Sequence, residues 1–399
     1  MPHQHKRSSV ISAVSTLAAA VALTWAGSAQ ADPNPYYIGA STSVGYDSNV
    51  FRLPKAVGDT TYSYGLLGGI DQTIGRQRLF ASGTVRDTRF VDQKQLNYID
   101  YSFLGGVDWK TVYSLSGTLS FSSNQSLYSA SGTNTRQSTA KNIERRDETI
   151  ASARYGAASL LSLDMSYTHR KQSYSDPLYQ FDSVSQDTTS VGLTYRPKAS
   201  LTLGTALRYT QGKYQSSQDF DRYDVDLSGN WIPTGLSSIN ARLSYSKRKS
   251  RSVVSELDFS GTTGQLQWSY QPTGKLRFNT SFSRDSGAES SFINNGGQQT
   301  GGPGDNSVLT NTLMANSVYS LTSKIQLNAG VRLMRRSLAR GALNGNDMVR
   351  SGSLGFSYGI LRNATLGCNL RRETRSASGS LSFDYRDSSV TCSAQISLQ

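Results

Sequence analysis

The chain alternates between large or apolar residues and small or polar residues with a period of two. In the segment 38–46 one parity holds Ile38, Ala40, Thr42, Val44 and Tyr46, and glycine and serine fill the positions between them. The same alternation returns in the segments 62–70, 101–109, 113–121, 223–231 and 325–333. A period of two predicts β-strands with two unlike faces, so we predict an all-β protein.

Applied along the chain, this pattern predicts about eighteen strands. They span residues 37–48, 60–72, 77–91, 97–109, 111–123, 146–157, 160–172, 186–196, 200–212, 220–232, 237–249, 257–270, 274–287, 307–320, 324–338, 347–360, 362–375 and 386–398. Strands of these lengths can cross a bilayer at a tilt. In the segment 257–270 the apolar parity changes between Thr263 and Leu266, which predicts either a bulge or an error in the strand boundary.

The connections between the predicted strands alternate in length. Short turns follow the even-numbered strands, at 73–76, 196–200, 233–235, 271–274 and 321–323. Long loops follow the odd-numbered strands, at 49–59, 124–145, 172–185 and 287–306. Bacterial outer-membrane barrels have short periplasmic turns and longer extracellular loops. The pattern therefore favours a transmembrane antiparallel up-and-down β-barrel with Pro197, Pro233 and Pro272 in the periplasm, over a β-sandwich or a β-solenoid.

The first residues have the features of an export signal. Lys6 and Arg7 precede an apolar stretch over residues 10–25, and the small residues of Ala29-Gln30-Ala31 follow. This order predicts a cleaved signal peptide at 1–31 and a barrel domain at 32–399. A membrane-anchoring helix is the weaker alternative, because serine and threonine interrupt the apolar stretch.

The composition excludes a helical membrane protein but is compatible with a β-barrel. The chain is 36% hydrophobic with a mean hydropathy of −0.44, and a barrel has such values because only alternate residues face lipid. The formal charge is +13, of which Lys6 and Arg7 supply two, leaving +11 on the mature chain. An anionic partner is therefore expected. Nucleic acid is not, because the basic residues are spread over many segments.

Catalytic chemistry finds little support. The mature chain has a single histidine, His169, on the apolar parity of a strand, where an exposed interfacial side chain is the simpler explanation. Asp224 and Asp226 share a lumen-facing parity, and we expect them to be a hydrated carboxylate pair rather than an acid–base pair. We predict no catalytic residue and no cofactor.

The first predicted loop contains oxygen ligands. Asp47, Asn49 and Asp59 flank it and could bind a divalent cation, but their spacing matches no complete calcium loop. We therefore expect turn-forming residues here and no metal site.

Five arginines on the polar parity of alternate strands define a candidate substrate path. They are Arg208, Arg242, Arg277, Arg332 and Arg371. A charge facing lipid at mid-depth would cost about 2–4 kcal/mol, so these side chains should point into the lumen, where they form a basic track that favours anions. The alternative is that they pair with lumen acids such as Asp164, Asp224 and Asp226 and serve as wall structure.

The two cysteines, Cys368 and Cys392, fall on the apolar parities of the last two predicted strands. They are nearly opposite if the loop 376–385 closes a symmetric hairpin, and opposed antiparallel residues lie about 4.5–5.5 Å apart at Cα, within disulfide range. Two alternatives stay open at this point: a cross-strand disulfide or two lipid-facing free thiols.

The segment VGYDSNVFR at 44–52 resembles the start of mature outer-membrane barrels encoded in exopolysaccharide biosynthesis operons, the EpsL-type family. The match is carried by Tyr46, Asp47, Asn49, Val50, Phe51 and Arg52. The hairpin at 191–214, with its Pro197 turn, is similar to the repeated hairpins of that family. The resemblance implies a barrel over the whole mature chain that passes a secreted polysaccharide across the outer membrane of a Gram-negative bacterium.

These observations lead to one expected function and two alternatives. We expect a passive, non-enzymatic channel for export of an exopolysaccharide, which is anionic if the basic track lines the lumen. The alternatives are a general or small-anion porin and a surface binding or structural barrel that conducts nothing. The expected partners are outer-membrane lipids and lipopolysaccharide, an anionic polysaccharide, the barrel assembly machinery and periplasmic polysaccharide-export components.

Overall fold

The computed structural model describes residues 34–398, apart from residue 113 and the segments 129–135, 157–158, 216–218, 252–257, 287–306 and 341–342. The predicted signal peptide and the predicted loop at 287–306 lie outside the described residues. The residues from Pro35 onward form one compact unit.

The described residues form eighteen strands and two short helical turns. The strands are β1 (Tyr36–Asp47), β2 (Asp59–Ile74), β3 (Gln77–Phe90), β4 (Tyr98–Lys110), β5 (Leu115–Leu127), β6 (Ile143–Tyr155), β7 (Leu161–Tyr174), β8 (Val184–Lys198), β9 (Leu201–Tyr214), β10 (Phe220–Thr234), β11 (Ser237–Ser250), β12 (Phe259–Tyr270), β13 (Leu276–Asp285), β14 (Ser307–Ser320), β15 (Ile325–Arg340), β16 (Leu343–Leu361), β17 (Ala364–Ser378) and β18 (Tyr385–Leu398). A 3-10 turn η1 (Lys94–Leu96) and a single helical turn α2 (Pro177–Gln180) lie in connections between strands.

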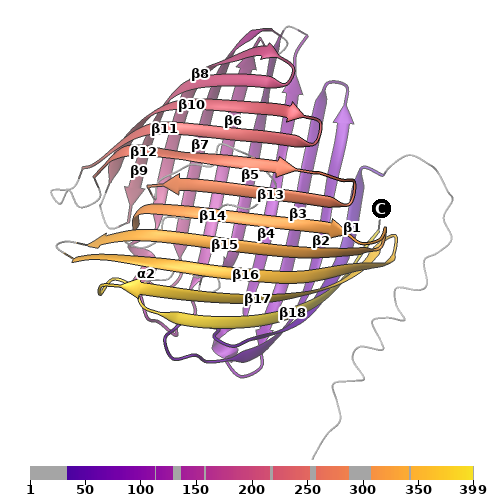
Figure 1. Ribbon diagram of the computed structural model, residues 1–399, viewed down its shortest axis with the longest axis vertical. Helices are drawn as coiled ribbons and strands as arrows, with labels where there is room; N and C mark the ends of the chain where they lie inside the picture. Colours follow the sequence, from indigo (N-terminus) through magenta and orange to yellow (C-terminus); the bar gives the residue numbers. More distant parts are fainter. Residues whose placement is uncertain are drawn as a thin grey trace, which may run out of the picture. The chain divides into compact units, whose positions relative to one another are not determined.

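The strands close into a barrel. Each strand pairs antiparallel with its neighbours in the chain, and β1 also pairs with β18, so the sheet has no free edge. Figure 1 shows β10–β18 crossing in front of β2–β7, which form the far wall. The predicted fold class and strand number are confirmed. Among the described residues no helix is both long and apolar enough to cross a membrane.

Burial alternates along the strands and shows which face meets lipid. In β10, Tyr223, Val225 and Leu227 are 57%, 49% and 58% exposed, whereas Asp224 and Asp226 between them are buried. A row of exposed apolar side chains on the outside is stable only against lipid. The apolar parity therefore faces outward and the polar parity faces the lumen, as the alternation predicts.

The change of parity in the twelfth strand is not a bulge. The β11–β12 pairing runs from Ser237↔Tyr270 to Arg248↔Phe259 without a register shift. Leu266 therefore faces outward while Phe259 faces inward near the loop end of the strand. The predicted boundary was wrong, because β12 begins at Phe259, two residues later than predicted.

The alternation of turn and loop lengths is confirmed with one exception. Short turns join β2 to β3 and β8 to β9, whereas β1 to β2 and β5 to β6 are joined by long connections. The exception is the pair β15 and β16, which we predicted to be separated by eight residues. Here β15 extends to Arg340 and β16 begins at Leu343, so both strands are longer than β14 and β17 beside them.

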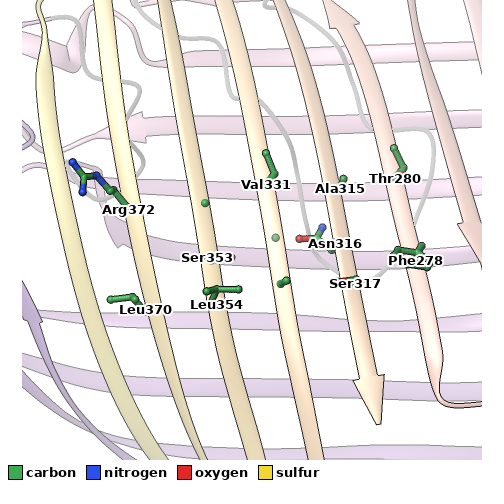
Figure 2. Close-up of a pocket in the computed structure, with 13 residues that line it drawn as sticks. Phe278, Thr280, Ala315, Asn316, Ser317, Val331, Ser353, Leu354, Leu370 and Arg372 are labelled. Carbon is green, nitrogen blue, oxygen red and sulfur yellow. The ribbon is translucent and has the colours of Figure 1, made fainter. Parts of the chain in front are cut away.

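A hollow of about 520 Å³ opens on the outward face of β13–β17 (Figure 2). Small outward residues line it, including Ala315, Ala329 and Gly352, and a Cβ added to Gly352 would meet no atom within 4 Å. In Figure 2 the hollow spans the strands between Phe278 on one side and Arg372 on the other. The hollow is therefore a recess in the lipid-facing surface, bordered by larger side chains such as Phe278, Leu354 and Leu370.

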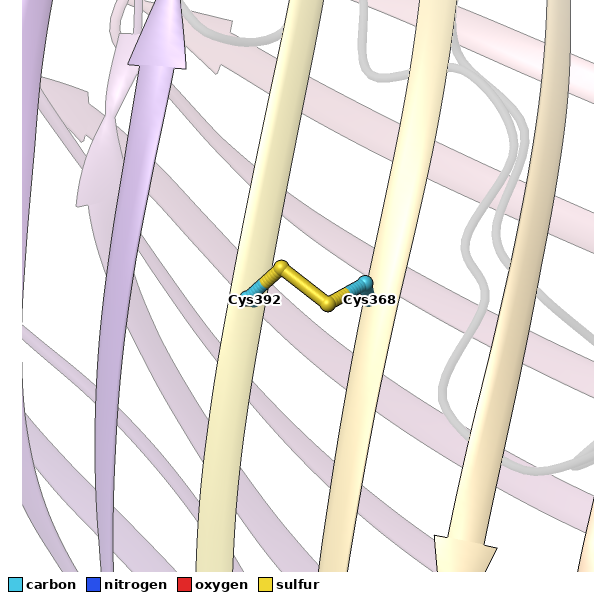
Figure 3. Close-up of a disulfide and its surroundings, with 2 residues drawn as sticks. All are labelled: Cys368 and Cys392. Carbon is cyan, nitrogen blue, oxygen red and sulfur yellow. A yellow bond between two sulfur atoms is a disulfide. The ribbon is translucent and has the colours of Figure 1, made fainter.

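Cys368 of β17 and Cys392 of β18 form a disulfide (Figure 3). The two residues are directly paired in the β17–β18 register, and Cys392 also pairs with Val44 of β1. Both lie on the outward parity. Of the two alternatives that the sequence leaves open, the structure contains the cross-strand bridge.

The predicted orientation can be tested with two single cysteines, because the native cysteines are bridged and should not react. Thr139→Cys lies in the long β5–β6 connection and Gly274→Cys in the short β12–β13 turn, and both positions are exposed. A membrane-impermeant maleimide should label Thr139→Cys on intact cells and Gly274→Cys only after permeabilisation. The reverse labelling would contradict the orientation.

The disulfide predicts a defined alkylation pattern. Alkylation of the denatured protein without reductant should leave both cysteines unmodified, and prior reduction should add one group to each, as measured by intact mass. The Cys368→Ser variant is the control, since its remaining thiol should react without reductant. Complete alkylation of the unreduced wild-type protein would show that the bridge does not form.

Candidate functional site in the barrel lumen

The lumen contains a dense and nearly balanced set of charges. The arginines that face inward are Arg52, Arg78, Arg86, Arg146, Arg154, Arg170, Arg208, Arg222, Arg242, Arg248, Arg277, Arg332, Arg336, Arg371 and Arg375. The inward carboxylates are Asp47, Asp59, Asp71, Asp100, Asp108, Glu144, Glu148, Asp164, Asp224, Asp226, Asp285, Asp347, Glu373 and Asp387. The positive charge of the chain is therefore not concentrated in the lumen.

Loop 1, residues 48–58, turns back into the lumen and places Arg52 among three carboxylates. Nη1 of Arg52 donates to both oxygens of Asp47 at 3.0 and 2.9 Å, and Nη2 lies 3.3 Å from Asp387. Nε lies 3.8 Å from Glu373. Burial opposes the guanidinium charge, but the carboxylates outweigh it and raise the pKa of Arg52 above its ordinary value. A fixed cation among anions thus anchors loop 1 to β1, β17 and β18.

The rest of loop 1 is tied down by Asn49 and by apolar packing. The amide nitrogen of Asn49 donates to the carbonyl oxygens of Leu53 at 2.8 Å and Arg386 at 3.0 Å. Arg52 has a φ of 53°, in the left-handed region, which turns the chain sharply after Phe51. An apolar cluster buries the loop against the ends of β3–β6, and consists of Val50, Phe51, Phe90, Leu96 and Leu127. Loop 1 therefore narrows the loop end of the lumen.

A second network covers the wall at β9–β12. Arg222 is fully buried, and its Nε and Nη2 donate to one oxygen of Asp224 at 2.9 and 2.8 Å. Its Nη1 donates to Ser286 Oγ at 3.0 Å. Arg208 lies 3.3 Å from Asp224 and 3.0 Å from Asp226. The expected hydrated carboxylate pair is therefore wrong: Asp224 and Asp226 are buried and neutralised by arginines.

All five arginines of the predicted basic track face the lumen, but they lie in three places. Arg208 belongs to the buried network, and Arg242 is half-buried on the adjacent wall at β11. Arg332 and Arg371 lie on β15 and β17, on either side of the β16 strand. Arg277 is exposed near the turn end of β13. A continuous track remains a prediction, and the structure assigns Arg208 to the wall.

Arg332 and Arg371 approach the loop 1 anchor. Arg371 donates to Glu373, the carboxylate that also faces Arg52. Arg332 pairs in register with Ser351, which pairs with Glu373, and its Nη2 lies 3.3 Å from Met334 Sδ. These two track residues therefore border the narrowed part of the lumen.

The remaining candidate residues have structural partners. His169 faces outward, with Nδ1 2.8 Å from Asp187 Oδ1. Asp59 accepts hydrogen bonds from the backbone N–H groups of Asp92 and Gln93 and so holds the β3–β4 connection. Within the described ranges no group of three metal-ligating side chains converges. The turn-forming interpretation of Asp59 fits these contacts.

Strand parity does not identify Arg52 as a lumen residue. Arg52 lies in a loop, where alternation does not predict the direction of a side chain, and its partners Glu373 and Asp387 are far away along the chain. The available signal was the segment 44–52, whose residues Asp47, Asn49 and Arg52 make the contacts that fold loop 1 inward.

No family model and no curated protein matches the chain. Solved structures do match it. The outer membrane protein OpdK from Pseudomonas aeruginosa has a TM-score of 0.51 and 14% identity, covering 91% of this chain and 99% of that chain. OpdK with vanillate gives the same values. OpdO from Pseudomonas aeruginosa has a TM-score of 0.50 and 14% identity, with 91% and 98% covered.

At these identities the likeness is one of fold. Together with the closed sheet and its lipid-facing apolar surface, it identifies the chain as a transmembrane β-barrel with the fold of Gram-negative outer-membrane barrels. The EpsL-type resemblance has no matching family model behind it and stays a prediction.

The buried position of Arg52 predicts a large stability effect. Arg52→Ala should leave Asp47, Asp387 and Glu373 without their cation and lower the free energy of unfolding by about 3–5 kcal/mol. Urea unfolding in detergent micelles measures this change. Arg89→Ala is the matched control, because the Arg89–Asp87 ion pair is exposed and should contribute little to stability. Equal effects of the two substitutions would contradict the anchor.

Proposed function

We propose that this barrel is a passive channel for small hydrophilic solutes, with loop 1 as its constriction. The observation that carries the proposal is the inward fold of loop 1, which Arg52 anchors to the opposite side of the β1–β18 seam. A closed barrel of this strand number leaves an interior wide enough for a channel. An inward loop reduces that width to one suited to small molecules.

The solute class follows from the charges of the lumen. Arginines and carboxylates face each other across its wall, so a solute meets both signs. Such a lumen favours weak selectivity among small polar solutes. Only Arg208 of the track is fully buried, and a modest preference for anions would come from the partly exposed arginines Arg242, Arg277, Arg332 and Arg371. Vanillate, with which OpdK was solved, is a suitable first solute to assay.

Export of an exopolysaccharide is the competing proposal. It rests on the resemblance of the segment 44–52 to the EpsL-type family. The contacts of Asp47, Asn49 and Arg52 offer a local explanation for that segment, since together they fold loop 1 inward. A narrowed lumen also fits a bulky polymer less well than a small solute. We therefore prefer the small-solute channel.

Single-channel recording in planar bilayers tests the proposal. The wild-type barrel should conduct, and Arg52→Ala, which releases loop 1, should increase the conductance by roughly half or more. Arg89→Ala is the control and should conduct like wild type, because its ion pair lies outside the lumen. Heat-modifiable migration on gels must first show that each barrel is folded.

Liposome flux separates the two transport proposals. Vanillate should enter liposomes that carry the barrel, whereas an entrapped anionic polysaccharide should be retained. Release of the polysaccharide at a comparable rate would favour export. A folded wild-type barrel that conducts nothing would contradict both proposals and leave a binding or structural role.

A further inference from the structure

Five arginines lie on the outward, lipid-facing parity of the wall formed by β13–β18. This arginine belt consists of Arg284, Arg335, Arg350, Arg372 and Arg386. Arg335, Arg350, Arg372 and Arg386 are exposed, and Arg284 is half-buried. A charge on this face is costly at the middle of the bilayer and nearly free of cost at the interface. The belt must therefore lie at an interface.

The position of each belt arginine along its strand identifies that interface. On β15 the outward residues from the turn end are Ile325, Leu327, Ala329, Val331 and Leu333, and Arg335 follows. On β17 they are Ala364, Leu366, Cys368 and Leu370, and Arg372 follows. The other three strands repeat this order, so each arginine is the first outward charge above an uncharged run. The belt thus marks the loop-side boundary of the hydrocarbon layer.

The strand register brings the belt residues close together. Arg284 and Arg335 both pair with Asn311, from its two sides. Arg350 and Arg386 both pair with Thr374 in the same way. Arg372 is two residues from Thr374, so it is a diagonal neighbour of both Arg350 and Arg386. Diagonal neighbours lie about 7–8 Å apart at Cα, a distance that long side chains can bridge. The belt is a continuous cationic surface.

The belt arginines differ from the outward arginines of the other walls in lacking acidic partners. On those walls, outward arginines near the loop end are ion-paired with outward carboxylates: Arg89 with Asp87 at 2.7 Å, Arg145 with Asp147 at 3.0 Å, and Arg251 with Asp221 at 2.5 Å. Across the described parts of β13–β18 no carboxylate faces outward, and none of the belt arginines is in an ion pair there. Five adjacent like charges repel one another unless an anion joins them.

The outward hollow lies directly below this belt. Arg372 is part of its lining, and Arg372 pairs in register with Gly352 on the hollow's floor. Apolar side chains border the hollow, including Phe278, Leu354 and Leu370 (Figure 2). The open space above Gly352 would accept atoms of a ligand without moving the protein. A cationic surface above an apolar recess matches a lipid with an anionic head group.

We propose that the belt and the hollow form a binding site for lipopolysaccharide of the outer leaflet. The phosphates of its lipid A portion would lie against the belt, since arginine binds phosphate through paired N–H donors. One acyl chain would occupy the hollow. Four of the arginines span the adjacent strands β15–β18, which are about 4.8 Å apart, so the surface is broader than one phosphate needs. The two separated phosphates of the acylated lipid A disaccharide match that breadth.

Native mass spectrometry of the detergent-solubilised full barrel, titrated with purified lipid A, tests the head-group contact. Arg350→Ala/Arg372→Ala should weaken lipid A binding at least tenfold. Arg89→Ala/Arg145→Ala removes two outward arginines from the opposite walls and should bind like wild type. If both double variants bind lipid A as tightly as wild type while remaining heat-modifiable, the belt is not the site.

The hollow and the lipid class are tested in the same assay. Gly352→Leu fills the hollow and should weaken lipid A binding several-fold, whereas Gly229→Leu, at an outward glycine of β10 outside the hollow, should not. Wild type should bind dephosphorylated lipid A and phosphatidylglycerol at least tenfold more weakly than lipid A. Equal binding of phosphatidylglycerol would overturn the assignment to lipopolysaccharide. Unchanged binding by Gly352→Leu would overturn the seat for the acyl chain.

Discussion

Every backbone N–H and C=O group inside a bilayer must find a partner within the protein, because lipid offers none. The chain meets this constraint by pairing its first strand with its last, from Ile38↔Leu398 to Asp47↔Ser389. The seam does more than remove two open edges. It brings the end of β1 beside the beginning of β18, so that Arg52 meets Glu373 and Asp387. The inward fold of loop 1 thus depends on closure of the barrel.

The lumen and the lipid-facing surface of the barrel differ in their balance of positive and negative side chains, which the composition of the chain does not reveal. Inside, arginines are matched by carboxylates, as in the pairing of Arg208 with Asp224 and Asp226. The outward surface carries the arginine belt, which has no such match within the described part of the chain. The excess positive charge of the sequence therefore describes the membrane-facing surface better than the pore, and the basic isoelectric point says little about what passes through.

The strands could be predicted because each of them records its own environment in a period of two. Leu207 and Tyr209 face lipid and Arg208 faces the lumen, and no distant residue is needed to infer this. Loop 1 could not be placed in that way, since Arg52 is bound by residues that follow it by more than 300 positions. The charges of Arg350 and Arg372 were counted toward an anionic partner, because net charge does not distinguish the lumen wall from the lipid-facing surface. The error over Asp224 arose for a related reason: neutralisation by Arg222 depends on packing inside the lumen, which alternation does not describe.

The bridge between Cys368 and Cys392 joins β17 to β18, the strand that pairs with β1 at the seam, and both residues lie on the lipid-facing parity. Soluble oxidants and thiol–disulfide exchange partners work in water, so they cannot reach these sulfur atoms once the wall is embedded. Oxidation therefore belongs to the time before insertion, when the last hairpin is still in the periplasm. A covalent link at that stage fixes the alignment of β18 against β17, and a slip of one residue would turn every side chain of β18 to the wrong face. The free edge of β18, which must pair with β1, then has a single alignment. Accurate closure of the barrel therefore depends on disulfide formation in the periplasm.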